Sequence, residues 1–208
     1  YRASVAGDGT QANNWSGWNG IDISADGRYV AFESCADNLV TGDTNGFSDI
    51  FVHDSQTGQT TRVSVTTGGA QASANSSSPS ISANGRYVAF ASEAANLVAA
   101  DTNGLRDVFV HDRQTGVTTR ASVATSGAQA NGWSGEGAVC ISADGRYVAF
   151  NSDASNLVAG DTNGRIDVFV RDMQTTTTTR ESLSTGSVQG NSWSGWGSLS
   201  LSADGRYL

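Results

Sequence analysis

The sequence predicts an all-β repeat protein, and two observations support this. The nine residues 24–32 (Ser-Ala-Asp-Gly-Arg-Tyr-Val-Ala-Phe) return almost unchanged at 82–90 and 142–150, and in shortened form at 202–208. The copies begin 58, 60 and 60 residues apart, a period long enough for one supersecondary unit per repeat. The chain also has 25 glycines, one proline and 38% apolar residues, which suits many short strands joined by glycine turns.

The first unit is expected to begin with a hairpin. Residues 10–20 are rich in Gly, Asn, Ser and Trp and lack apolar periodicity, so they are expected to form a loop. Residues 21–24 form the expected first strand and 28–34 the second. Between them, Gly27 supplies the positive φ that a tight hairpin turn commonly requires. Both faces of the second strand are mostly apolar, as in a sheet that is covered on both sides.

Two further strands complete each unit. A connection at 35–48 leads to a third strand at 49–53, and a Ser-Gln-Thr-Gly turn leads to a fourth strand at 60–65. The second unit repeats this order at 81–92, 107–112 and 118–123, and the third at 139–152, 167–172 and 177–183. By the same alignment, residues 1–5 are expected to be the last strand of a preceding unit. Residues 199–208 are expected to supply a first strand and part of a second.

Repeated four-stranded antiparallel units with both faces buried predict the blades of a β-propeller. We expect residues 1–208 to form a single partial propeller domain of about 3.5 blades. The expected repeats cover about 6–65, 66–123 and 124–183, with end strands at 1–5 and 197–208. Propellers typically have four to eight blades. We therefore expect a longer parent chain to supply the missing blades, or two copies to join as a homo-oligomer.

The turn and the third strand carry a family resemblance. The motif Ser-Ala-Asp-Gly-Arg-Tyr-Val-Ala-Phe, followed by Asp-Val-Phe-Val-His-Asp and Gln-Thr-Gly, resembles the repeat of TolB-like β-propellers, which are similar to WD-repeat blades. The resemblance covers essentially the whole chain and implies the propeller fold. This sequence departs from the family's compact repeat at two places: the connection after the second strand is long, and the loop before each first strand is extended. The fold serves enzymes, scaffolds and lectins alike.

Charge and composition exclude several classes of partner. The net charge is −8 and all 12 basic residues are arginines, so a surface that follows nucleic-acid phosphates is not expected. The sequence contains no run of about 18 apolar residues, so membrane insertion is not expected. Cys35 and Cys140 lie at non-equivalent repeat positions about two units apart. Because repeat units contact only their neighbours, a disulfide between them is not expected. The sequence opens at Tyr1 without a signal-like segment, and we expect a mature or excised portion of a longer protein.

The connection after each second strand contains a candidate calcium site. Oxygen-bearing side chains at alternate positions, with a glycine at the bend, are similar to short calcium loops. The alternative is an Asx turn, in which Asp and Asn bind nearby backbone N–H groups and Gly adopts the left-handed conformation. The candidate metal ligands are Asp43, Asn45, Asp49, Asp101, Asn103, Asp107, Asp161, Asn163 and Asp167.

The loop before each first strand contains a candidate carbohydrate site. Exposed indole rings bordered by Asn and Ser suit sugars, whose C–H faces stack on the ring while their hydroxyls form hydrogen bonds. The loop is expected to share one face of the propeller with the Asp-Thr-Asn-Gly connection. The alternative is that the rings pack between adjacent blades. The candidate ligand-binding residues are Asn14, Trp15, Trp18, Asn131, Trp133, Asn191, Trp193 and Trp196.

Catalysis has little support in the sequence. The two histidines, His53 and His111, occupy one repeat position that holds Arg171 in the third unit, so we expect a tolerant surface position. Asp54 and its equivalents are expected to form structural hydrogen bonds. The sequence therefore favours a non-catalytic, lectin-like module outside the cytoplasm, either extracellular or periplasmic. The alternatives are a protein-binding scaffold and the propeller part of an extracellular hydrolase or lyase.

Overall fold

The structure, a computed structural model, describes residues 1–195 and 197–208. This part contains three four-stranded antiparallel sheets and no helix, so no helix in it could cross a membrane. The first sheet contains β1 (Ser16–Ile23), β2 (Tyr29–Ser34), β3 (Asp49–Asp54) and β4 (Thr60–Arg62). The second contains β5 (Ser76–Ile81), β6 (Tyr87–Ser92), β7 (Asp107–Asp112) and β8 (Val117–Arg120). The third contains β9 (Ser134–Ile141), β10 (Tyr147–Ser152), β11 (Asp167–Asp172) and β12 (Thr177–Arg180).

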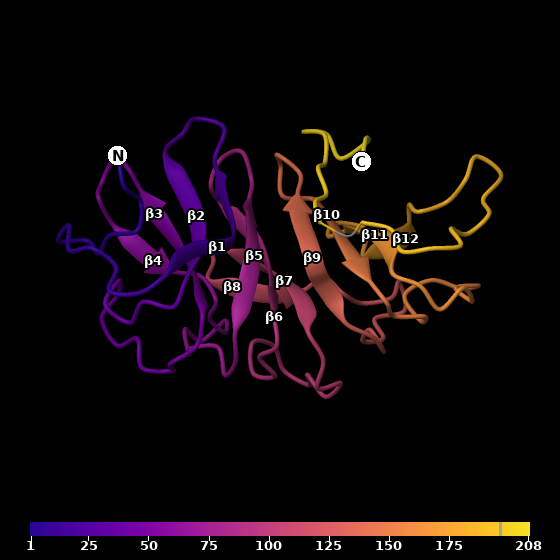
Figure 1. Cartoon of the computed structure of the whole chain (residues 1–208), viewed down its shortest axis with the longest axis horizontal. Coiled ribbons are helices and arrows are strands. Elements are labelled where there is room, and N and C mark those ends of the chain that lie inside the picture. The colour runs from indigo at the N-terminus through magenta and orange to yellow at the C-terminus, as the bar shows by residue number, and fades with distance from the viewer. Residues whose placement is uncertain (196) are drawn as a thin grey trace.

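The three sheets lie side by side along the long axis of the molecule (Figure 1). Within each sheet the strands follow chain order, and the first strands β1, β5 and β9 contact one another in turn. Side chains from facing sheets form shared cores. One core joins Ala31, Ile50 and Val52 of the first sheet to Phe90 and Phe109 of the second. The predicted blades, buried on both faces, are confirmed.

The repeated turn is held by its own side chains. Gly27 has φ of +72° and its N–H donates to the Ser24 carbonyl over 2.8 Å. Asp26 Oδ1 accepts from Ser24 Oγ at 2.6 Å and from the Arg28 N–H at 3.0 Å. Arg28 then binds Asp54 at the end of β3 with two bonds of 2.8 and 2.7 Å, which holds the pKa of Asp54 well below its usual range. The expected structural role of Asp54 is confirmed.

The first strands begin earlier than predicted. Residues 16–20, expected as a loop, belong to β1, and β5 and β9 are extended in the same way. The pairing of β1 with β2 is irregular between Ser16 and Ile21. Glycines with positive φ, Gly17 and Gly20, lie within this stretch. A bulged strand loses the strict alternation of side chains, which is why the sequence pattern predicted a loop.

The two end segments are not strands. Residues 1–5 form only an isolated bridge from Val5 to Gln11, and 197–208 form no strand, although Gly205 and Ser202 close the same turn as in the other units. A strand requires a hydrogen-bonded neighbour. The third strand that would pair with 1–5, and the strands that would continue 197–208, are not among the described residues. That the two segments become strands beside such neighbours stays a prediction.

The histidine position is buried, which corrects the expectation of a tolerant surface site. His53 and His111 are almost fully buried, and burial lowers the pKa of both rings. His53 Nδ1 lies 2.8 Å from Thr60 Oγ1, and Thr60 donates to the Val5 carbonyl at 2.5 Å. The position therefore holds an outer strand against the segment that precedes it.

Candidate functional site

The residues predicted as calcium ligands surround a buried arginine in each sheet. In the first sheet, Arg62 Nη1 lies 2.9 Å from Asp43 Oδ1 and 3.3 Å from Asp49 Oδ2. Ser64 Oγ donates to Asp49 at 2.5 Å, and Asn45 Nδ2 donates to Asp49 at 2.8 Å. Burial raises the pKa of Asp43 and Asp49. We call this group the Arg–Asp cluster.

The same cluster recurs in the other two sheets. Arg120 binds Asp101 at 3.3 Å and Asp107 at 2.9 Å, and Arg180 binds Asp161 at 3.0 Å and Asp167 at 3.6 Å. Asn103 and Asn163 donate to Asp107 and Asp167 at 2.9 and 3.0 Å. The guanidinium supplies the positive charge that these carboxylates need. Calcium binding remains a prediction, and a cation at these oxygens would have to displace the arginine.

The connecting loop also forms the hydrogen bond of an Asx turn. Asn45 Oδ1 accepts from the Phe47 N–H at 3.1 Å, and Asn103 and Asn163 bind Leu105 and Arg165 in the same way. Within the described residues, no group of three or more His, Cys, Asp or Glu side chains is placed to hold a metal ion. A calcium titration of the melting temperature would test the prediction.

The predicted tryptophans are exposed and lie on different units. Trp15 and Trp18 are 69% and 75% exposed, and their rings stack with centroids 5.4 Å apart and planes 18° apart. Trp133, before β9, and Trp193 are also exposed. Trp196 lies outside the described residues. The structure thus stacks Trp15 on Trp18, and packing between sheets does not bury any of the four described rings.

The predicted asparagines play different local roles. Asn14 Oδ1 accepts from the Trp15 N–H at 2.8 Å, and Asn131 Nδ2 donates to Ser155 at 3.0 Å. Asn191 is exposed. Asn13, which was not predicted, donates to Asp37 Oδ1 at 2.6 Å. This bond joins the loop before the first strand to the connection after the second, as the expected shared face requires.

A pocket of about 360 Å³ opens beside the tryptophan pair, between the first and second sheets. We call it the Trp15 pocket. Its walls come from β1 and β2, from the loop before β5, and from the residues that flank the connection after β6. The lining residues that matter for its chemistry are Trp15, Trp18, Asn19, Glu33, Glu93 and Arg106.

Glu33 forms a fixed carboxylate in this pocket. Its side chain is buried, and Oε1 accepts from Ser48 Oγ at 2.7 Å. Asn19 contributes two more hydrogen bonds of 3.2 Å each, one from its backbone N–H and one from Nδ2. A buried carboxylate is tolerated when donors satisfy it. These three bonds fix the position of the carboxylate.

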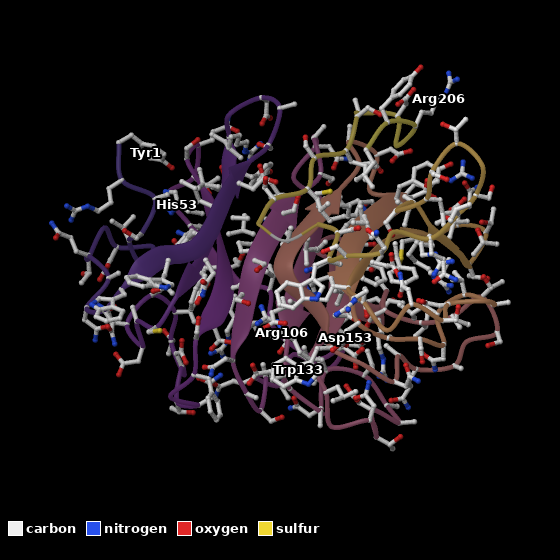
Figure 2. All side chains as sticks on the ribbon, turned by 45° about the vertical axis from the view of Figure 1, so that its right-hand side comes forward. Tyr1, His53, Arg106, Trp133, Asp153 and Arg206 are labelled. Atoms are coloured by element: carbon white, nitrogen blue, oxygen red, sulfur yellow. The ribbon has the colours of Figure 1, made fainter. Side chains whose placement is uncertain are left out.

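Arg106 contributes the positive charge of the Trp15 pocket. Nη2 donates to Ser77 Oγ, while the buried Nε has no hydrogen-bond partner among the described residues. Burial lowers the pKa of Arg106, and the charges of Glu93, Glu136 and Glu33 oppose this shift. Figure 2 shows Arg106 near the middle of the molecule, between the ends marked by Tyr1 and Arg206. The pocket therefore combines both charges with an aromatic rim.

These residues are absent from the predicted site because they do not recur in the repeat. Ala91 and Asn151 take the position of Glu33 in the other sheets, as the strand pairing shows. Ser48 and Ile166 take the position of Arg106. The signal that could have revealed the pocket was the departure of single residues from an otherwise regular repeat.

Similarity to known proteins is detectable in structure. No protein-family model matches the chain, and no curated protein matches it. TolB from Acinetobacter baumannii matches with a TM-score of 0.53 and 18% identity, over 95% of this chain and 37% of that chain. The fold is that of a TolB-like β-propeller. The propeller also matches an oligogalacturonate lyase in complex with manganese, with a TM-score of 0.51 and 12% identity, over 83% of this chain and 43% of that one.

The propeller thus spans less than half the length of either matched structure. At these identities the likeness establishes the scaffold, and the same scaffold carries unrelated functions. The function of this propeller must therefore be argued from its own side chains.

Proposed function

We propose that this propeller is a non-catalytic carbohydrate-binding module and that the Trp15 pocket holds the sugar. The observation that carries the proposal is the stacked, exposed Trp15–Trp18 pair at the edge of a pocket that contains a fixed carboxylate. An indole face binds the apolar C–H face of a sugar ring, and the carboxylate accepts hydrogen bonds from sugar hydroxyls.

The size and polarity of the pocket support this assignment. Small-ligand sites commonly measure about 300 to 1,000 Å³, and the Trp15 pocket, at about 360 Å³, is at the lower end. This volume suits one or two sugar rings, with the rest of an oligosaccharide lying along the exposed indoles. Asn19 and Arg106 supply donors, while Glu33 and Glu93 supply acceptors. A ligand with many hydroxyl groups uses both kinds of partner.

An array of neutral and acidic oligosaccharides tests the proposal. The strongest hit would then be titrated against the protein while tryptophan fluorescence is recorded. We expect Trp15→Ala and Trp18→Ala each to weaken binding by about tenfold or more, equivalent to about 1.4 kcal/mol. Trp193→Ala is the matched control, because it also removes an exposed indole but lies outside the pocket.

A blank array would contradict carbohydrate binding and would favour a protein-binding scaffold. Equal losses in Trp15→Ala and Trp193→Ala would contradict the assignment to this pocket. Placement of the protein outside the cytoplasm remains a prediction from the sequence.

A further inference from the structure

We propose that the sugar held in the Trp15 pocket is an amino sugar whose ammonium group lies against the carboxylates of Glu33 and Glu93. This class of ligand rests on the proposed carbohydrate function and narrows it. Three features of the pocket support it: the shortened strand that opens the pocket, the charges that lack a counterion, and the aromatic rim.

A strand that is two residues shorter than its equivalents opens the pocket. β1 and β9 have eight residues each, whereas β5 has six. The first serine of each strand, Ser16, Ser76 or Ser134, pairs with the last serine of the following strand. The two missing residues therefore belong to the bulge after Ser76, and Ser76 and Ser77 line the pocket. Both walls of the pocket come from sheets within the chain.

At the other two positions equivalent to Glu33, a bulge glycine of the next unit covers the side chain. A Cβ atom built on Gly135 would lie 2.9 Å from Ala91 Cβ, and one built on Gly195 would lie 3.5 Å from Asn151 Cβ. Ala91 and Asn151 occupy the repeat position of Glu33. β5 contains no glycine. The pocket lies beside Glu33 in the place of that missing cover.

The two carboxylates of the pocket have no cation of their own. Glu33 is 6% exposed, and its hydrogen-bond donors, Ser48 and Asn19, are neutral. Every ion pair among the described residues joins an arginine to an aspartate, so neither Glu33 nor Glu93 belongs to one. Hydrogen bonds between ionised groups are stronger than those between neutral groups. An ammonium group on the ligand would supply the missing positive charge.

Arg106 does not neutralise the pocket. Its Nη2 donates to Ser77 Oγ, and its Nε is buried out of reach of a ligand. Arg106 is the single cation among the described lining residues, where it faces Glu33 and Glu93. The carboxylates outnumber the guanidinium by two to one. An acidic sugar would therefore meet net negative charge, whereas an amino sugar would be attracted.

The aromatic rim favours the same ligand. Trp15 and Trp18 are largely exposed and stack on each other beside the carboxylates. An indole face attracts a nearby cation, and tryptophan does so more strongly than the other aromatic residues. The same face also stacks on the C–H face of a sugar ring. An amino sugar uses both interactions, while a neutral sugar uses only the second.

Binding of a glucosamine tetramer and of its fully N-acetylated form tests the proposal. Both are titrated against the 208-residue chain, with tryptophan fluorescence as the readout. We expect the N-acetylated tetramer to bind measurably and the free-amine tetramer to bind about tenfold more tightly or better. This preference should shrink with added salt, because salt screens the attraction between ammonium and carboxylate.

Removal of one carboxylate should reduce the preference for the free amine. We expect Glu93→Gln and Glu33→Gln each to lower it by about threefold or more. Glu93 is exposed, so Glu93→Gln preserves the fold even if loss of the hydrogen-bonded Glu33 carboxylate does not. Glu181→Gln is the matched control, because it removes the same charge from an exposed position outside the pocket. Circular dichroism would verify the fold of each variant.

Equal affinity for the two tetramers, or tighter binding of the N-acetylated form, would overturn the amino-sugar assignment and leave the carbohydrate function standing. An equal loss of preference in Glu93→Gln and Glu181→Gln would also overturn it, because the net charge of −8 would then explain the preference. Binding of neither tetramer would overturn the assignment, and a blank oligosaccharide array beside it would overturn the carbohydrate function as well.

Discussion

The Arg–Asp clusters and the Trp15 pocket differ in how often their residues recur. Each cluster is built from the same residue types in all three sheets, and each arginine is buried against two carboxylates. The Trp15 pocket combines Glu33, Arg106 and the stacked tryptophans only once among the described residues. A side chain that stabilises the blade fold is expected in every blade. A side chain that occurs in a single blade is therefore not needed to form the blade, and we infer that it serves binding.

This difference separates stability from binding. Each cluster holds the connection after the second strand against the fourth strand. It also contacts the loop that leads into the next unit, where Arg62 Nη1 donates to Gln71 Oε1 at 3.0 Å. The tryptophan pair leaves most of its surface in water, so it contributes little to the cores. We therefore expect substitutions in the clusters to destabilise the fold and substitutions at the pocket to change binding.

The largest expected effect is at the central cluster. Arg120→Met would leave Asp101 and Asp107 buried without their cation, and breaking a buried ion pair in this way costs about 3 to 5 kcal/mol. Urea unfolding would measure the change in the free energy of unfolding. A loss below about 1 kcal/mol would show that the clusters do not support the blades.

The next effect tests the junction between sheets. Gly85→Ala should destabilise the chain by about 1 to 3 kcal/mol more than Gly58→Ala, because only Gly85 faces a tyrosine ring. The two positions have φ of +71° and +75°, so their backbone strain is matched. Thermal unfolding of both variants is the measurement. Equal melting temperatures would contradict the tight packing of Tyr29 on Gly85.

A smaller effect concerns acid stability. The contact with Arg86 lowers the pKa of Asp112 in the folded chain. The pair therefore stabilises the fold above the ordinary aspartate pKa of about 3.9, and this stabilisation is lost as the pH falls toward the lower folded pKa. Asp112→Asn should flatten the loss of stability below about pH 4.

The raised pKa of Asp43, Asp101 and Asp161 acts in the opposite direction. These aspartates are present in both the wild type and the Asp112→Asn variant, so the difference between their acid unfolding curves isolates the contribution of Asp112. Parallel curves below pH 4 would contradict the role of the Arg86–Asp112 pair.

The smallest expected change in stability is at the pocket. Trp15→Ala should alter the free energy of unfolding by no more than about 0.5 kcal/mol, because the ring is largely exposed and stacks on Trp18, which is itself exposed. Urea unfolding would measure it beside Arg120→Met. A loss comparable to that of Arg120→Met would show that the ring is structural and would remove the contrast between the two regions.

The sequence was sufficient for the regular part of the fold. The turn at Gly27, the second and third strands and the role of Asp54 follow from local rules that act in every unit. The early start of β1 could not be predicted, because its bulge hides the alternation of side chains. The burial of His53 depends on a neighbouring segment far away in the sequence.

The candidate site was predictable only in part. The polar composition of the tryptophan loop pointed to Trp15 and Trp18, which the structure leaves exposed and places together. Glu33, Glu93 and Arg106 reach the same pocket from three separate segments of two sheets. Such convergence depends on how neighbouring sheets pack, and no spacing in the sequence expresses it.

The most direct test of sugar binding at the Trp15 pocket is a saccharide titration of the wild type, Trp15→Ala and Trp193→Ala, with tryptophan fluorescence as the readout. We expect the wild type and Trp193→Ala to bind, and Trp15→Ala to lose affinity by about tenfold or more. Unchanged affinity in Trp15→Ala, or an equal loss in both variants, would contradict the claim that the residues that break the repeat form the binding site.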